Sequence, residues 1–255
     1  MKGARMPDVI YEKHDFYAVF TMNRPESLNA QSVRLGAELG EAVADFNHDA
    51  NMRVGILTGA GRAFSAGADL KEMAEGDGAE EDNWDDTMFS RSSKPFIAAI
   101  NGLCIGGGLE SALDCDIRIC STEAYFGLFE VKRGITASYA WYHLPRTISA
   151  AASNYVLLTG DRISTEQALQ FGIVTEVVEP ERLMPRAVEI AGLIAQNAPL
   201  SVQGTKEVAR SWRIAGLDDS VRVGSPTLAR IMESQDAIEG PTAFAEKRDP
   251  QWQGR

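Results

Sequence analysis

Two glutamate residues, Glu110 and Glu130, lie 20 positions apart and have the surroundings of an acid/base pair. Glu110 follows three glycines, residues 106–108, where a backbone without Cβ atoms lets main-chain amides approach a ligand. Glu130 follows the aromatic residues Tyr125 and Phe126. Apolar neighbours disfavour the charged form of a carboxyl group and raise its pKa, and a second carboxylate nearby raises it further. One glutamate can then donate a proton while the other accepts one.

Three segments of the sequence resemble other functional motifs but lack a residue that each motif requires. Gly59 and Gly61 match the first two glycines of the dinucleotide-binding motif G-x-G-x-x-G, but Phe64 occupies the position of the third glycine. Residues 102–107 are not followed by the lysine and hydroxyl residue of a phosphate-binding loop. The near match to a nucleophile elbow has Ala63 at its first glycine. We therefore do not expect dinucleotide binding, nucleotide hydrolysis or serine hydrolase chemistry.

The histidines and cysteines indicate neither a metal site nor a disulfide framework. His14, His48 and His143 have no metal-ligand spacing, and the C-x4-C spacing of Cys115 and Cys120 matches no common zinc motif. Three cysteines are too few for a disulfide scaffold, which favours a reducing compartment. We expect no bound metal.

The net charge and the N-terminal sequence limit the possible partners and the cellular location of the protein. A net charge of −11 argues against nucleic acid, because phosphate binding depends on lysine and arginine, and against an anionic membrane surface. Residues 1–13 contain no apolar signal segment, and no apolar run is long enough to span a membrane. The sequence predicts a soluble, cytoplasmic protein with neither nucleic acid nor membrane as its partner.

The elements that would position the two glutamates follow a mixed α/β pattern. Residues 9–11 and 16–22 predict a hairpin, and the spacing of Leu35, Leu39, Val43 and Phe46 predicts an amphipathic helix. Short apolar runs, partly β-branched, predict buried strands. These runs are residues 54–58, 96–100, 117–120 and 173–178.

The second half of the chain changes character. After Pro199 the sequence predicts helices only, as far as Gly240-Pro241. We therefore expect a core in residues 1–197 and a C-terminal helical subdomain in residues 198–255. An acidic stretch, residues 72–86, predicts a solvated loop or frayed helix, and the alternative is a lid over a ligand.

Two segments carry a family resemblance when they are taken together, residues 64–73 (FSAGADLKEM) and residues 99–110 (AINGLCIGGGLE). They resemble the enoyl-CoA hydratase/isomerase family, the crotonase superfamily. The resemblance implies an α/β fold, a crotonase-like spiral of repeated ββα units with a C-terminal helical region that takes part in trimer assembly. Further matches lie at residues 23–30, 158–163, 168–174 and 244–250.

The resemblance also implies a substrate, an assembly and roles for four residues. The substrate is an acyl-CoA thioester, with coenzyme A as part of it and no separate cofactor, and the assembly is a homotrimer or a hexamer built as a dimer of trimers. The amide N–H groups of Ala68 and Gly107 would form an oxyanion hole for the thioester carbonyl. Glu110 and Glu130 would hold one water, whose oxygen adds to Cβ while Glu130 mediates proton delivery to Cα.

The motifs that identify the residues binding the rest of the substrate are less specific than those of the four residues above. Adenine is expected near residues 65–70, and basic residues, one of them from a neighbouring subunit, would meet the phosphates. Asp69 has a simpler role as the cap of a helix that begins there. The candidate substrate-binding residues are Arg24, Ala66, Asp69, Leu70, Lys71, Ser138, Trp141 and, from a neighbouring subunit, Lys247.

The sequence departs from the family pattern after Glu130, where residues 134–146 read GITASYAWYHLPR. Many family hydratases have a paired glycine here, whereas Tyr139, Trp141 and Tyr142 are bulky. These aromatic residues reshape the acyl pocket, or indicate a substrate that is not a simple linear enoyl chain, or belong to the core. The leading hypothesis is a hydratase that forms a 3-hydroxyacyl-CoA. The alternatives are an isomerase or another enolate-forming enzyme of this superfamily, and an acyl-CoA-binding protein without activity.

Overall fold

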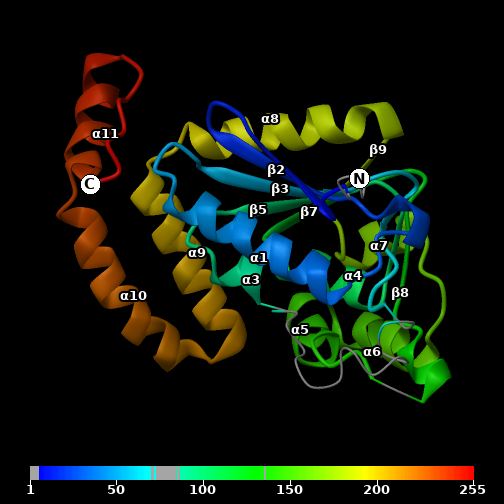
Figure 1. The fold of residues 1–255 in the computed structure, drawn as a ribbon. Helices are drawn as coiled ribbons and strands as arrows, with labels where there is room; N and C mark the ends of the chain where they lie inside the picture. Colours follow the sequence, from blue (N-terminus) through cyan, green and yellow to red (C-terminus); the bar gives the residue numbers. More distant parts are fainter. Residues whose placement is uncertain (1–5, 70–71, 73–84, 86, 135) are drawn as a thin grey trace.

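The protein is built around two β-sheets (Figure 1). The structure, a computed structural model, describes residues 6–69, 72, 85, 87–134 and 136–255. The larger sheet has the strand order β1-β2-β3-β5-β7-β9, and the smaller has the order β4-β6-β8. The strands are β1 (Val9–Lys13), β2 (Tyr17–Met22), β3 (Val54–Gly59), β4 (Ala63–Ser65), β5 (Phe96–Ile100), β6 (Leu103–Ile105), β7 (Ile117–Ser121), β8 (Tyr125–Gly127) and β9 (Glu176–Val178).

From β3 to β8, successive strands alternate between the two sheets. β3, β5 and β7 lie side by side in the larger sheet, and the strand that follows each of them enters the smaller sheet. The pairings of β4 with β6 and of β6 with β8 are parallel, like those of β3, β5 and β7. β1 and β2 form the predicted antiparallel hairpin. This arrangement confirms the predicted spiral of repeated β-strand pairs and helices.

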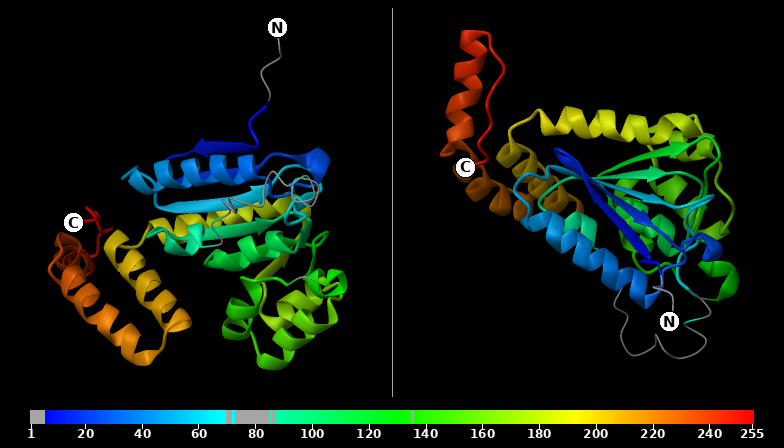
Figure 2. Two further views of the ribbon diagram at one scale, coloured as in Figure 1. Left: turned by 60° about the horizontal axis from the view of Figure 1, so that its bottom comes forward. Right: turned by 45° about the horizontal axis from the view of Figure 1, so that its top comes forward.

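Helices cover both faces of the larger sheet, with α1 on one face and α8 on the other (Figure 2). α4 and α7 lie against the smaller sheet. The helices are α1 (Val33–His48), α3 (Met88–Arg91), α4 (Gly107–Asp114), α5 (Ala140–Thr147), α6 (Ala150–Thr159), α7 (Thr165–Phe171), α8 (Leu183–Ala195), α9 (Pro199–Ile214), α10 (Leu217–Met232) and α11 (Gln235–Glu246), with short 3-10 turns η1 (Pro25–Ser27), η2 (Glu130–Arg133) and η3 (Pro180–Arg182).

Strand β5 shows why the predicted apolar runs become central strands. Phe96, Ala98 and Ile100 pack into the cluster that contains α1, while Ile97 and Ala99 face the cluster that contains α8. Successive side chains of a strand point to opposite faces, so a strand covered on both sides carries apolar residues on both faces. The same argument explains the apolar residues of β3 and β7, which flank it, although β7 also contains the buried Arg118, which donates to the carbonyls of Ile173 and Cys115.

The C-terminal helices pack beside the sheets and then leave them. Lys206 on α9 is buried, and its ammonium group donates to the Asp116 carboxylate at 2.7 Å and to the carbonyls of Phe89 and Lys94 at 2.8 and 2.9 Å. α10 runs back along α9, and α11 stands away from the sheets (Figure 2). The predicted helical content after Pro199 is thus confirmed.

Two predicted boundaries are wrong. The helix predicted to end at Gly240-Pro241 continues as α11 to Glu246, because proline removes one backbone donor but its fixed φ is compatible with a helix. The strand predicted at residues 173–178 begins only at Glu176. Ile173 folds back after the left-handed Gly172, and its N–H donates to the Ala168 carbonyl at 2.8 Å, as at a helix C-terminus.

Most of the acidic stretch, residues 72–86, lies outside the described residues, so the prediction of a loop or lid there stays a prediction. Among the helices that the structure describes, none has the length and apolar composition needed to cross a bilayer.

Candidate functional site

The site is built around the start of α4, where three glycines allow close backbone packing. Gly106 precedes the helix with φ of +53° and donates its N–H to the Gly127 carbonyl at 2.9 Å. A Cβ atom on Gly106 would lie 2.7 Å from Oε1 of Glu130, which is too close for any real contact. The glycine therefore makes room for the Glu130 carboxyl group beside the helix N-terminus.

A second loop, which contains Gly67 and Ala68, lies directly against this helix start. Gln31 holds the loop in a single parallel bridge: its N–H donates to the Gly67 carbonyl at 2.8 Å, and its carbonyl accepts from the Asp69 N–H at 3.1 Å. Gly67 has φ of +81°, and a Cβ atom there would lie 2.8 Å from the amide nitrogen of Gly107. The positive φ and the close approach together explain why glycine occupies position 67.

The backbone N–H groups of Ala68 and Gly107 lie side by side. A Cβ atom on Gly107 would lie 3.6 Å from the Ala68 nitrogen. Within the described part of the chain, neither N–H donates to an acceptor. Gly107 is the first residue of α4, so its N–H cannot be used by the helix, and the helix dipole favours negative charge there. Two adjacent free donors of this kind can bind one anionic oxygen.

Gln31 was not identified from the sequence. Its Nε2 atom donates to the Gly107 carbonyl at 3.0 Å and to the Ser111 hydroxyl at 2.8 Å. Since its backbone also holds the Gly67 loop, this one residue ties both amide-bearing segments together. It follows the family-like segment of residues 23–30, which is the only signal that the sequence offers for it.

Glu110 lies in the first turn of α4 and is buried, with 8% of its surface exposed. Its Oε1 atom accepts from the backbone N–H groups of Tyr139 and Ala140 at 2.9 and 2.8 Å. Both donors belong to the start of α5, where the first amides of a helix have no partner inside it. The helix start therefore orients the carboxyl group.

Glu130 opens the turn η2 directly after β8. Burial raises the pKa of its carboxyl group, in the direction that the sequence predicts, while Arg133 opposes the shift. Its Oε2 atom is buried and has no hydrogen-bond partner among the described residues. A buried polar atom without a partner costs free energy and is a frequent feature of ligand-binding positions. Oε1 lies beside Gly106, so both glutamates border the same helix start.

The candidate residues for adenine and phosphate binding are placed less specifically. Arg24 is already engaged, because its Nη atoms donate to the Asp69 carboxylate at 3.0 Å and to the Ala30 carbonyl at 2.6 Å. The Ala66 N–H donates to the Leu28 carbonyl at 2.9 Å. Asp69 also accepts from the Glu72 N–H at 3.5 Å, as the predicted helix cap would. The candidates Leu70 and Lys71 lie outside the described residues.

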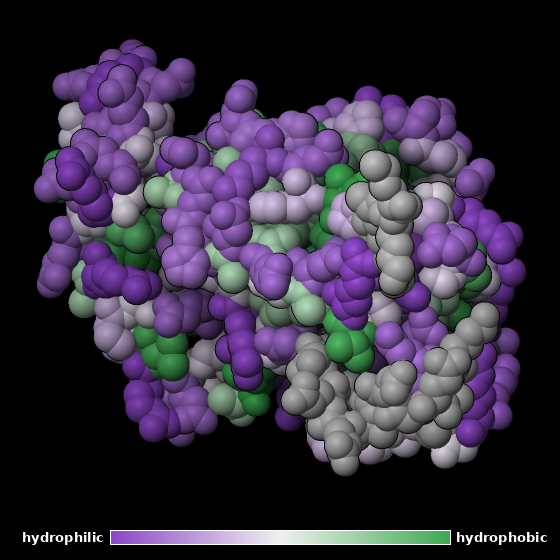
Figure 3. Space-filling view, viewed as in Figure 1, coloured by the Kyte–Doolittle hydropathy of each residue, from purple (hydrophilic) through white to green (hydrophobic). Residues whose placement is uncertain are grey.

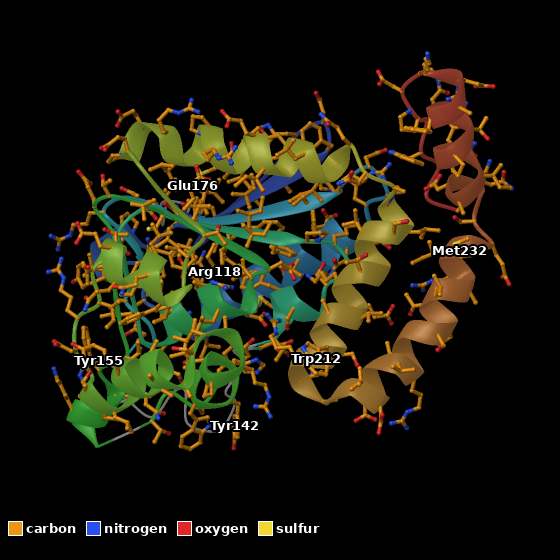
Figure 4. The ribbon with its side chains drawn as sticks, turned by 180° about the vertical axis from the view of Figure 1, so that it is seen from behind. Arg118, Tyr142, Tyr155, Glu176, Trp212 and Met232 are labelled. Atoms are coloured by element: carbon orange, nitrogen blue, oxygen red, sulfur yellow. The ribbon has the colours of Figure 1, made fainter. Side chains whose placement is uncertain are left out.

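The other candidates lie on α5 and α11. Ser138 is exposed just before α5, and Trp141 and Tyr142 are exposed on it, with Tyr142 on its outer side (Figure 4). Tyr139 is buried, so the aromatic segment is core in part and surface in part. Lys247 ends α11, the helix that stands away from the sheets, and the structure does not bring it to the glutamates of its own chain.

Comparison with known proteins points to one family. The sequence profile of the family described as Enoyl-CoA hydratase/isomerase matches residues 12–255. A carnitinyl-CoA dehydratase from Salmonella arizonae is 41% identical over 245 residues, which cover 92% of this chain and 94% of that protein. One from Escherichia coli strain K12 is 40% identical over 246 residues, with the same coverage.

Solved structures are similar over nearly the whole length. An enoyl-CoA hydratase from Mycobacterium marinum has a TM-score of 0.92 and 37% identity, with 98% of this chain and 100% of that one covered. An enoyl-CoA hydratase from Mycobacterium tuberculosis has a TM-score of 0.91 and 35% identity, with the same coverage. The profile match, the identities and the fold lead to one conclusion: the chain belongs to the enoyl-CoA hydratase/isomerase family of the crotonase superfamily.

Proposed function

We propose that this protein adds water across the 2,3 double bond of a 2-enoyl-CoA thioester and forms a 3-hydroxyacyl-CoA. One observation carries the proposal: the adjacent N–H groups of Ala68 and Gly107, free within the described chain, border the same helix start as the carboxyl groups of Glu110 and Glu130. Hydration needs these two functions together, because it develops negative charge on the thioester oxygen and moves protons nearby.

The two amides would bind the thioester carbonyl oxygen. When water adds to Cβ, electron density moves through Cα to that oxygen, and an enolate forms. The Gly107 N–H at the start of α4 and the Ala68 N–H beside it stabilise the enolate more than the neutral thioester. Each donor of this kind contributes roughly 3 kcal/mol to transition-state stabilisation.

The two glutamates would handle the water and the protons. The water oxygen bonds to Cβ, and one proton is delivered to Cα, so the product contains the elements of one water. Glu130 suits proton delivery, because burial raises its pKa and favours its protonated form. Glu110, held by the N–H groups of Tyr139 and Ala140, suits the orientation of the water.

Family membership implies an acyl-CoA substrate, and the curated relatives suggest a second candidate activity. They are named carnitinyl-CoA dehydratase, and dehydration is the reverse of hydration. Dehydration of carnitinyl-CoA would use the same amides and carboxyl groups. Of the basic residues proposed for the CoA phosphates, Arg24 is engaged with Asp69, which leaves Lys71 and a neighbouring subunit's Lys247 as the stronger proposals.

We also propose that the chain assembles as a trimer or a dimer of trimers through its C-terminal helices. Large apolar side chains are exposed along them, among them Leu228, Met232 and Phe244. Figure 3 shows apolar residues at the surface of this region, and Figure 4 shows Met232 on α10. Large apolar side chains that are exposed in an isolated chain are often covered when copies of the chain associate.

The test is a panel of CoA thioesters: 2-enoyl thioesters of graded chain length, branched and aromatic ones, and carnitinyl-CoA. Hydration is followed by loss of absorbance at the conjugated double bond and by a product heavier by one water. In D2O, the product should carry deuterium at Cα. Carnitinyl-CoA, if dehydrated, should show the opposite absorbance change.

Two outcomes would contradict the proposal. Double-bond migration or exchange at Cα without water addition would indicate an isomerase or another enolate-forming enzyme. Thioester binding with neither water addition nor exchange would indicate a binding protein. Either result would leave the family assignment intact, since the family contains several reactions on one fold.

A further inference from the structure

Tyr139 joins two carboxyl groups that lie on one face of α4. Its backbone N–H donates to Glu110 Oε1 at 2.9 Å, and its hydroxyl group donates to Asp114 Oδ1 at 2.7 Å. Glu110 and Asp114 are four residues apart, so their side chains lie one above the other on the helix. A single residue thus holds both carboxyl groups, one through its main chain and one through its side chain.

The side-chain end of this connection is fixed inside the protein. Asp114 is 1% exposed, and its Oδ2 atom accepts from the N–H groups of Phe89 and Ser90 at 2.8 and 3.0 Å. Tyr139 is 5% exposed, and its ring stacks on His143 at a centroid distance of 3.8 Å and an interplanar angle of 8°. The ring and the hydroxyl group therefore have one position, which fixes the residue that bears them.

The main-chain end orients Glu110. Tyr139 is the residue before α5, and Ala140 is its first residue, so their N–H groups are helix-start donors without helical partners. Both bind the same oxygen of Glu110. If the helix start shifted or tilted, these two donors would leave the carboxyl group together, and a small displacement of a reacting group lowers turnover strongly.

We propose that Tyr139 is a positioning residue for Glu110 in the reaction proposed above. Its hydroxyl bond to Asp114 sets the start of α5, and the start of α5 sets the carboxyl group of Glu110. The inference rests on the proposed function, because Glu110 is taken to hold the water. Tyr139 is buried in the aromatic segment 134–146, and this positioning role differs from lining the acyl pocket.

The test is a double-mutant cycle of Tyr139→Phe and Glu110→Gln, assayed with a 2-enoyl-CoA thioester. The phenylalanine keeps the ring stacked on His143 and removes the hydroxyl group only. We expect Tyr139→Phe to lower kcat about tenfold with KM changed less than twofold, because in the proposed reaction Glu110 orients the water and not the thioester. In the Glu110→Gln background the same substitution should have no further effect on kcat. Tyr155→Phe, which removes the hydroxyl group of an exposed tyrosine on α6, should match the wild-type protein.

The outcomes separate this inference from the proposed function. If Glu110→Gln itself leaves turnover unchanged, the role of Glu110 fails and the inference fails with it. If Glu110→Gln lowers turnover but Tyr139→Phe acts equally in both backgrounds, or not at all, only the positioning role is overturned. A crystal structure of Tyr139→Phe gives a readout that needs no turnover: the Glu110 carboxyl group should leave the Tyr139 N–H position, and an unchanged carboxyl group would overturn the inference.

Discussion

Gly67 packs so closely on the amide nitrogen of Gly107 that a Cβ atom at position 67 would lie 2.8 Å from it. The two glycines belong to different β-strand connections, 40 residues apart in the sequence. Their contact brings the Ala68 and Gly107 N–H groups together, so the spacing of these two donors depends on the absence of a side chain at position 67.

Replacing Gly67 by alanine should therefore separate the two donors. We expect kcat for the thioester to fall by about 10² to 10³, the usual loss when one oxyanion donor is removed. Because φ is +81°, the substitution should also lower the free energy of unfolding by about 1–3 kcal/mol. Steady-state kinetics and urea unfolding measure the two effects.

Gly172→Ala is the matched control for this change. Gly172 has nearly the same φ, +82°, but a Cβ atom there would meet nothing closer than 3.8 Å. It should lose stability through backbone strain and keep its turnover. Equal turnover losses in the two variants would show that strain, and not the donor spacing, lowers the rate.

Glu130 should make the stability of the protein depend on pH. Burial raises its folded-state pKa above the unfolded value near 4.5, so its stabilising contribution is complete below about pH 4.5 and is lost as the pH rises through the folded pKa. Glu130→Gln removes this contribution. Relative to wild type, the variant should gain free energy of unfolding as the pH rises, with no such gain below pH 4.5, in urea titrations across this range. A constant difference would contradict the assigned burial.

His143 should have the opposite effect from Glu130, because its contribution to the stability of the protein is lost as the pH falls. Burial, with the nearby Arg213 adding to it, lowers the pKa of His143 to about 4, well below its ordinary 6.5. Its contribution to stability is therefore present above pH 6.5 and is lost as the pH falls toward 4. His143→Gln should flatten the loss of stability between pH 6.5 and 4, measured by thermal unfolding. An unchanged slope would show that this imidazole is not buried as described.

Lys206 should be essential for holding α9 against the core. Lys206→Met removes the ammonium group that neutralises the Asp116 carboxylate and donates to two carbonyls, which should cost about 3–5 kcal/mol of unfolding free energy. Arg182→Ala breaks an exposed ion pair with Glu189 and should cost less than about 1 kcal/mol. If the two variants are equally stable in urea titrations, the buried ion pair does not anchor the helix.

Assembly should depend on the exposed apolar residues of α10 and α11. The double substitution Met232→Glu and Ile238→Glu places charges on two side chains that are each 65% exposed in the isolated chain. We expect sedimentation or light scattering to give a trimer or hexamer for the wild type and a monomer for this variant. Leu193→Glu, on α8, should leave the mass unchanged. A wild-type monomer at all concentrations would contradict the proposed assembly.

Local sequence patterns predict the parts of the fold that depend on local physics. The central strands follow from uninterrupted apolar runs such as residues 96–100, and α1 follows from apolar residues at helical spacing. The glycines before Glu110 indicate a close backbone approach, which the contact of Gly67 with Gly107 explains. The end of α11 was mispredicted because a proline weakens a helix without always ending it.

The parts that could not be predicted depend on contacts between distant residues. Gln31 binds the Gly107 carbonyl across 76 positions, and Lys206 binds Asp116 across 90. The hydrogen bond of Tyr139 to Asp114 spans 25 positions. No periodicity or motif encodes such pairs, because the fold creates them when it brings separate elements together. The residues of the site were recognised by family resemblance, whereas the residues that support it emerge only from the structure.

The central claim is that Glu110 and Glu130 carry out hydration beside the two amide donors. The most direct test compares kcat for the best 2-enoyl-CoA thioester in the wild type, in Glu110→Gln and in Glu130→Gln, together with the Kd of the thioester. General acid–base groups contribute about 10²- to 10⁴-fold, so each variant should lose at least about 10² in kcat while Kd changes little. Wild-type rates in both variants would contradict the account.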